Sequence, residues 1–257
     1  IFTGSNALDM STGAVTMTAD IQITTNGDGV ALTQDGIIGG AFRLTKMGVG
    51  TLELNQANTY RGTTLTNGLL NIEDASSLGA VAGMFIINGG TLDNTSVGLL
   101  STVNYPQRWN ANWTFTGTNN LDLGIGTIDF TSDISLTTSM NTLTVGGAIN
   151  DATFSLTKLG GGVLEFEIQA IALKDIIVTG GTLTPPTGVG TLILAGDLIN
   201  NSTLTTTTGK IEFNGATAQS ISGSGAVEIF AMEKSGGGLL TLNRAVNVNS
   251  AMTMTSG

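Results

Sequence analysis

The sequence contains no cysteine and no histidine, and only three prolines among 257 residues. Without cysteine the chain has no disulfide, no thiol nucleophile and no thiolate metal site. Without histidine it also lacks the commonest general base of enzymes. Aromatic residues make up 5% of the chain and charged residues 11%, whereas an average soluble domain carries about 25% charged residues. We therefore predict that the chain is not an enzyme and that it holds no catalytic residue, metal or cofactor.

Positive charge and long apolar runs are scarce as well. Nine Lys and Arg stand against nineteen Asp and Glu, for a formal net charge of −10. A protein that binds duplex nucleic acid needs a basic patch, which nine scattered cations do not supply. A membrane-spanning helix needs about 18 or more consecutive apolar residues. We therefore expect no nucleic-acid partner and no transmembrane segment in this piece.

Glycine and threonine are abundant, and 40% of the residues are hydrophobic. No Gly-X-Y period is present, which excludes collagen, and the chain is too apolar to be disordered. Threonine and valine favour strands, while Gly, Asn and Asp favour turns. No segment shows a convincing helical period with caps. This composition predicts an all-β protein of many short strands joined by sharp corners.

A strand–glycine–strand motif occurs three times. It reads FRLTKMGVGTLEL at 42–54, FSLTKLGGGVLEF at 154–166 and FAMEKSGGGLLTL at 230–242. Apolar residues two apart on both sides of a glycine pair are typical of two strands joined by a tight turn. The motif's lysine and two glycines are Lys46, Gly48, Gly50, Lys158, Gly160, Gly162, Lys234, Gly236 and Gly238. Such recurrence indicates a repeat architecture.

A second phrase gives the length of the repeat. TNGLLNI at 66–72, NGGTLDN at 88–94 and TGGTLTP at 179–185 each place Leu two residues after Gly, and the first two are 22 residues apart. One coil of a parallel β-helix has about that length. The chain would then form about eleven or twelve coils, stacked at about 4.8 Å. We expect strands within 21–25, 51–55, 127–131, 142–146, 191–195, 210–214 and 246–250.

Residues 42–79 resemble the autotransporter-associated β-strand repeat of bacterial surface proteins. The matching features are L-T-K-x-G-x-G-T-L-x-L, A-N-T-Y-x-G-T-T, N-G-x-L and A-S-S-L-G. The resemblance implies a right-handed parallel β-helix at the cell surface or outside the cell, and it implies a scaffold without activity. It is strongest in the first copy, because the second lacks N-T-Y-x-G and the third keeps only the lysine–glycine core.

We interpret residues 1–257 as a single β-solenoid segment. The chain opens and stops in mid-pattern, so we expect an interior piece of a longer protein. Each coil cannot bury its apolar face alone, so we expect flanking coils, or further subunits end to end, as partners. The interior should contain Leu52, Leu54, Leu70, Leu92, Leu164, Phe166, Leu183 and Leu242.

The motif lysines and the few paired carboxylates are candidate sites. Alternation puts each lysine on the same side as its apolar neighbours, and we expect its ammonium group to reach water or cap carbonyls. Glu165 and Glu167 share a strand face, and Asp129 and Asp133 are also close in sequence. Glycoside hydrolysis needs two carboxylates about 5–10 Å apart across a cleft. We interpret these acids as solubilising, with a polysaccharide-processing enzyme as the alternative.

The sequence NYPQRWNANW holds the strongest concentration of aromatic rings. Tyr105, Arg108, Trp109 and Trp113 are candidates for a surface that binds a glycan or a host cell, because flat rings stack on sugars. The two tryptophans are four residues apart, which would put both on one strand face, and core packing is the preferred interpretation.

The leading prediction for function is a passive structural stalk or filament segment of a bacterial extracellular surface protein, of the adhesin-passenger type. The alternatives are a glycan- or host-binding adhesin module and a β-helix enzyme that processes polysaccharides.

Overall fold

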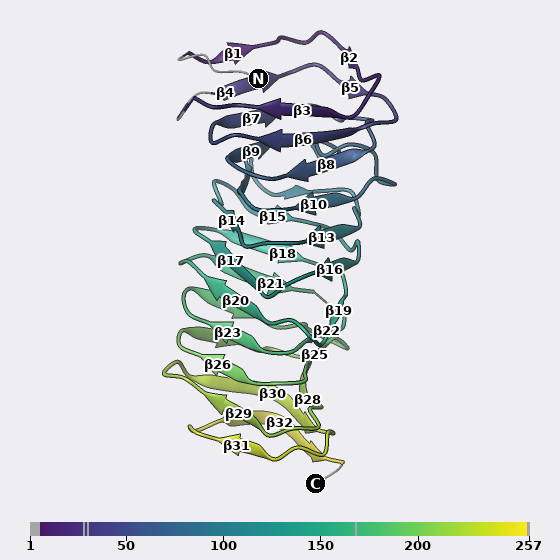
Figure 1. The fold of residues 1–257 in the computed structure, drawn as a ribbon. Coiled ribbons are helices and arrows are strands. Elements are labelled where there is room, and N and C mark those ends of the chain that lie inside the picture. Colours follow the sequence, from purple (N-terminus) through teal and green to yellow (C-terminus); the bar gives the residue numbers. More distant parts are fainter. Residues whose placement is uncertain (1–5, 28, 30, 168, 256–257) are drawn as a thin grey trace.

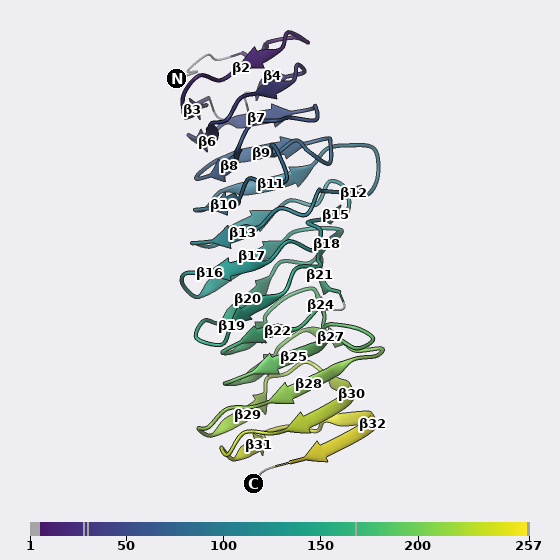
Figure 2. The same cartoon turned by 90° about the vertical axis from the view of Figure 1, so that its right-hand side faces the viewer.

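The computed structural model describes residues 6–27, 29, 31–167 and 169–255, and no helix occurs among them. The strands are short and lie one below another along a rod, with the two termini at opposite ends (Figure 1). Every pairing between described strands is parallel, as Figure 2 shows for β7, β9 and β11. The predicted all-β parallel solenoid is therefore confirmed, with about twelve coils.

The rod has three faces, each a ladder of parallel strands. The first face, a sheet of twelve strands, consists of β1 (Leu8–Asp9), β4 (Ala31–Gln34), β7 (Thr51–Leu54), β9 (Leu69–Ile72), β11 (Thr91–Asn94), β14 (Trp113–Phe115), β17 (Ile134–Thr138), β20 (Leu156–Leu159), β23 (Ile176–Val178), β26 (Leu198–Asn200), β29 (Gln219–Ser222) and β31 (Leu240–Leu242). The second face consists of β3 (Ile21–Thr24), β6 (Arg43–Met47), β8 (Gly62–Leu65), β10 (Phe85–Ile87), β13 (Gln107–Trp109), β16 (Ile128–Phe130), β19 (Ile149–Asp151), β22 (Ile171–Leu173), β25 (Thr191–Leu194) and β28 (Lys210–Phe213).

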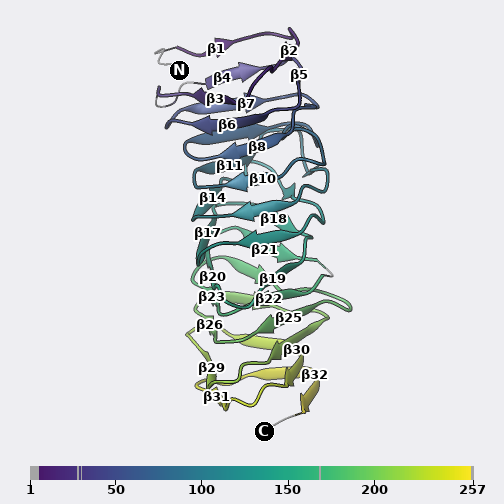
Figure 3. The ribbon, with the colours of Figure 1, turned by 45° about the vertical axis from the view of Figure 1, so that its right-hand side comes forward.

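The third face begins only partway along the rod. It consists of β12 (Leu100–Ser101), β15 (Leu121–Asp122), β18 (Thr142–Val145), β21 (Val163–Phe166), β24 (Thr182–Thr184) and β27 (Thr203–Thr205), of which β18 and β21 are labelled in Figure 3. Nearer the N-terminus a short pair, β2 (Val15–Thr16) and β5 (Ile38–Gly39), stands apart from the other sheets.

Two long strands form the C-terminal end of the described rod. β30 (Val227–Lys234) pairs with both β27 and β28, so the second and third faces merge there, and β32 (Asn247–Met254) pairs along β30. The register shifts between Ile229 and Ala231, where β30 turns from one face to the other. All seven strands expected from the sequence fall on observed strands.

Alternation along each strand builds the core. In β7, Leu52 and Leu54 are buried while Thr51 and Glu53 are partly exposed. In-register pairing then stacks like on like, as in Leu52–Leu70–Leu92. The pairing of Leu70 with Leu92 confirms the 22-residue coil predicted there. One continuous hydrophobic core results, because each interior row is covered by the next.

Seven of the eight residues expected in the interior are buried, and Leu242 is not. Its side chain is 47% exposed. Leu242 lies in β31, the last strand of the first face, so no described strand of that face covers it on the side toward the C-terminal end. The prediction failed because interior position follows from the repeat, whereas burial also requires a following coil.

Candidate functional sites

Each motif lysine points into the rod and bonds backbone carbonyls. Lys46 is fully buried, and its Nζ donates hydrogen bonds of 3.0 Å to the carbonyl oxygens of Met47, Gly48 and Asn67. The first two belong to its own corner, and Asn67 belongs to the next coil. Three carbonyl dipoles around one ammonium group offset much of the cost of removing it from water.

The second copy reproduces this arrangement, which we call the lysine cradle. Lys158 is fully buried and donates to the carbonyls of Leu159 at 2.8 Å, Gly160 at 3.0 Å and Gly180 at 3.0 Å, the last again from the next coil. Lys234 donates to Gly236 in its own corner. A next-coil acceptor is not described for this copy, because the chain after Thr255 lies outside the described residues.

Burial sets the titration of the cradle lysines. It lowers the pKa of Lys46 and of Lys158 from 10.5 to about 8, because the charged form loses its hydration. Both groups thus remain mainly charged at neutral pH. Each of these lysines links two neighbouring coils by hydrogen bonds, and its ammonium group is not presented to solvent.

The motif glycines allow neighbouring corners to touch. Gly48 and Gly160 have φ of +76° and +79°, a region that disfavours residues with a Cβ. A Cβ on Gly160 would also lie 2.3 Å from the carbonyl oxygen of Thr138 in the preceding coil. The third copy differs, since Gly236 keeps φ outside this region, yet its Cβ would meet the Asn214 oxygen at 2.2 Å. Close stacking of the coils therefore requires these glycines.

Residues of the A-N-T-Y-x-G-T-T phrase, at 57–64, form a network of buried hydrogen bonds that was not predicted from the sequence. Tyr60 is fully buried, and its hydroxyl bonds the Ser77 carbonyl at 3.0 Å and the Thr63 hydroxyl at 2.7 Å. Asn58 Nδ2 donates to the same Ser77 carbonyl at 2.8 Å. Tyr105, from the next coil, donates to Gly79 at 2.8 Å. These bonds hold the A-S-S-L-G turn against the part of the rod that lacks third-face strands.

The structure buries the aromatic candidates. Tyr105, Trp109 and Trp113 are 1%, 0% and 3% exposed, whereas the Arg108 side chain is 44% exposed. The two indoles meet edge to face at 5.0 Å, and Trp109 stacks on Phe130 at 5.3 Å. The tryptophans lie on different faces, at the end of β13 and the start of β14, because the chain turns a corner between them. The expectation that they share one strand face was therefore wrong, and their rings are not available to a surface ligand.

The candidate carboxylates lie on the outside of the rod. Arg108 pairs with Asp129 at 3.5 Å, and Asp133 accepts the Ser155 backbone N–H at 2.9 Å. Partial burial raises the pKa of Glu167, and the negative charges of the neighbouring Asp122 and Glu165 raise it further. Among the described residues no cluster of three acidic side chains is placed to bind a metal ion, and no helix is long and apolar enough to cross a membrane.

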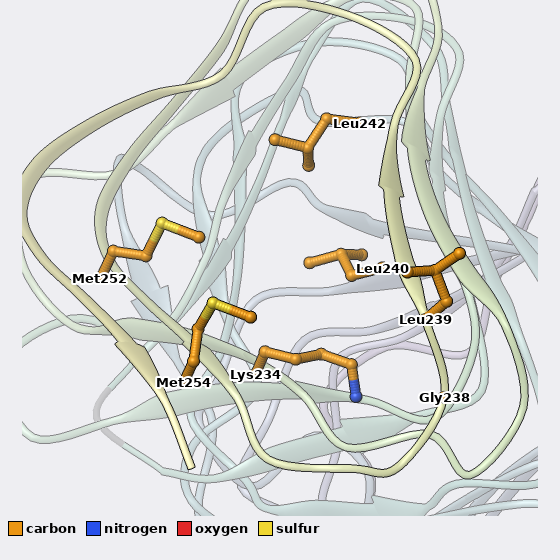
Figure 4. A pocket seen from close by; sticks show the side chains of 7 residues that line it. All are labelled: Lys234, Gly238, Leu239, Leu240, Leu242, Met252 and Met254. Carbon is orange, nitrogen blue, oxygen red and sulfur yellow. The ribbon is translucent and has the colours of Figure 1, made fainter. Parts of the chain in front are cut away.

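Both ends of the described rod expose the core. At the C-terminal end a hollow of about 140 Å³ lies between Met252 and Met254 on one side and Leu240 and Leu242 on the other, with Lys234 at its base (Figure 4). At the other end a smaller hollow of about 50 Å³ is lined by residues that include Met10, Val15, Ile21 and Leu32. These apolar surfaces are the cross-section of the solenoid itself.

Comparison with known proteins gives one partial similarity. The chain is 42% identical over 74 residues to the adhesin BmaC autotransporter of Brucella suis biovar 1 (strain 1330). The match covers 28% of this chain and 2% of the adhesin. No protein-family model matches the chain, and no solved structure matches it.

Proposed function

We propose that this chain is a rod segment of a bacterial extracellular surface protein of the adhesin-passenger type, serving as a stalk or filament without catalysis of its own. The observation that carries the proposal is the single core, continuous through about twelve coils. Its fully buried lysines are used on corner carbonyls within the rod. A solenoid of this kind gains length with each added coil, because each coil contacts only its neighbours.

The partial similarity to an autotransporter adhesin supports a location at the bacterial surface or outside the cell. The exposed core at both ends supports flanking coils, or further subunits end to end, as partners. A terminal strand with free backbone groups favours another parallel strand over water. In this proposal the rod holds a functional tip away from the cell.

The test is the removal of whole coils from the intact protein. Ile134, Leu156 and Ile176 are stacked in register, so deleting residues 156–175 removes one coil and places Ile134 on Ile176. We expect the rod to shorten by about 5 Å while tip function survives, measured by electron microscopy and a binding or activity assay. Deleting 156–165 is the matched control, since it breaks the register and should disrupt the local fold.

If the one-coil deletion abolishes tip function while the remaining coils stay folded, the segment is more than a spacer. That result would overturn the stalk proposal.

Adhesion through the rod's own surface is the second candidate, and the adhesin similarity favours it. Because Trp109 is a core residue, its replacement would test folding and not binding. The informative variants are on the surface, such as Arg108→Ala and Val97→Asp, where Val97 is fully exposed on the loop after β11. Loss of binding to glycans or host cells by either folded variant would support adhesion. Turnover of a polysaccharide that Glu165→Gln abolishes would instead support an enzyme.

A further inference from the structure

The corner between β8 and β9 contains an asparagine followed by glycine, Asn67–Gly68. The Asn67 side chain is exposed to water, and Gly68 has a φ of +72°. Asn–Gly is the sequence in which a backbone nitrogen most readily approaches the preceding side chain, because glycine has no Cβ to obstruct it.

Two hydrogen bonds converge on this dipeptide. The Gly68 N–H donates to Asn67 Oδ1 at 2.8 Å, which places that nitrogen next to Cγ of the same side chain. Lys46 Nζ donates to the Asn67 backbone carbonyl at 3.0 Å, which is the carbonyl of the Asn67–Gly68 peptide bond. The ammonium group draws electron density through that carbonyl, so the Gly68 N–H becomes more acidic and its nitrogen anion is stabilised.

The three other Asn–Gly steps lack this combination. Asn88 Oδ1 accepts a bond from Asn110 at 2.7 Å. The Gly215 N–H, after Asn214, donates to Gln219 at 2.9 Å. Asn26 directs its oxygen to the next coil, 2.6 Å from where a Cβ on Gly48 would lie. In the second lysine cradle the place of Asn67 is taken by Gly180, which has no side chain to react.

We propose that Asn67 is a site of spontaneous covalent modification, in which the Gly68 nitrogen closes a succinimide ring under activation by Lys46. The Gly68 N–H gives its proton to solvent hydroxide, and the nitrogen forms a bond to Cγ of Asn67. The Cγ–Nδ2 bond then breaks, and Nδ2 leaves as ammonia after taking a proton from water. One water molecule opens the ring at either carbonyl and leaves aspartate or isoaspartate at position 67.

The product alters the lysine cradle. Isoaspartate inserts a methylene into the main chain at a corner where Gly68 already packs against the Gly48 and Gly50 carbonyls, since a Cβ on Gly68 would lie 2.3 and 2.5 Å from them. The carbonyl carbon that Lys46 faces then no longer belongs to a peptide bond, because in isoaspartate it becomes the free α-carboxylate and the main chain continues through Cγ. The conversion therefore changes the peptide geometry of the first cradle and leaves the second cradle unchanged, because Gly180 has no side chain to react.

The experiment follows the four Asn–Gly steps in the 257-residue chain during incubation at neutral pH, by peptide mass spectrometry and isoaspartyl methyltransferase labelling. In the folded chain we expect Asn67 to convert at least about tenfold faster than Asn88 or Asn214, the factor that one charge-assisted hydrogen bond supplies. In urea, where the corner is lost, the steps should convert at similar rates. Asn67→Gly, which reproduces the glycine of the second cradle, is the control that removes the signal at this position.

Lys46→Met tests the activating group. In a folded Lys46→Met chain the advantage of Asn67 should disappear, and an advantage that persists would overturn the role of Lys46. If Asn67 converts no faster than Asn88 and Asn214 in the folded chain, or leads by the same factor in urea, the proposal is wrong. Even if Lys46→Met does not fold, the contrast between the folded and the unfolded chain still decides whether the folded corner accelerates conversion of Asn67.

Discussion

Replacing Lys158 with methionine measures what a lysine cradle contributes to stability. Methionine keeps an apolar stem of similar length but lacks the ammonium group, so three carbonyls lose a hydrogen bond: those of Leu159 (2.8 Å), Gly160 (3.0 Å) and Gly180 (3.0 Å). A buried acceptor without a donor costs about 1–3 kcal/mol. Because methionine is neutral, the variant avoids the cost of burying a charge, and this offsets part of the loss. We therefore expect the free energy of unfolding to fall by about 2–4 kcal/mol.

Lys174→Met is the matched control, because this lysine is exposed and its ammonium group pairs with Asp175 at 3.3 Å on the outside of the rod. It should change stability by no more than about 0.5 kcal/mol. Urea unfolding followed by circular dichroism gives the free energies, and hydrogen exchange at the corners near residues 160 and 180 locates the loss. If Lys158→Met is as stable as Lys174→Met, the cradle does not stabilise the rod and the reasoning fails.

The corners, the lysine titration and the core each give a further prediction. Gly160→Ala should destabilise the chain by at least about 1–2 kcal/mol, because its φ is positive and because a Cβ there would lie 2.3 Å from the Thr138 carbonyl oxygen. Gly161→Ala, with its nearest neighbour at 3.5 Å, should be close to neutral, and equal effects in thermal unfolding would contradict this. The lowered pKa of Lys46 and Lys158 means that the folded chain holds fewer protons than the unfolded chain above about pH 8. The contribution of these two lysines to the free energy of unfolding should therefore be flat below that pH and rise from there toward about pH 10, and a fall across that window in urea titrations would be inconsistent with it. Trp109→Ala should cost about 3–5 kcal/mol by leaving a cavity against Phe130, and a variant as stable as the parent would show that the ring is not a core residue.

The repeat made the fold predictable from the sequence. Period-two alternation identified the strands, and the 22-residue spacing gave the coil at Leu70 and Leu92. It also put the motif lysines on the interior side, since Lys46 alternates with Leu44. Both signals are local or periodic, so a single sequence is enough to show them.

Other features depend on contacts between coils and were not predictable in this way. Tyr60 and Ser77 are seventeen residues apart, and only the folded coil brings them together. The sequence spacing of Trp109 and Trp113 suggested one strand, but the corner between them separates the faces. The reactivity proposed at Asn67 likewise depends on Lys46, twenty-one residues earlier.

The interior donors give the rod a direction along which it can assemble. Lys46, Lys158 and Asn200 bond carbonyls that come later in the chain, at Asn67, Gly180 and Ala226. Gln34 and Gln219 instead bond carbonyls of the preceding coil, such as Gly13 and Leu194. A coil whose buried donor bonds the next coil keeps that donor unpaired until the next coil folds. A coil whose buried donor bonds the preceding coil can form its hydrogen bond as soon as it folds. A chain folding progressively from its N-terminus would thus secure Gln34 on arrival, whereas Lys46, Lys158 and Asn200 would each wait for the coil that follows.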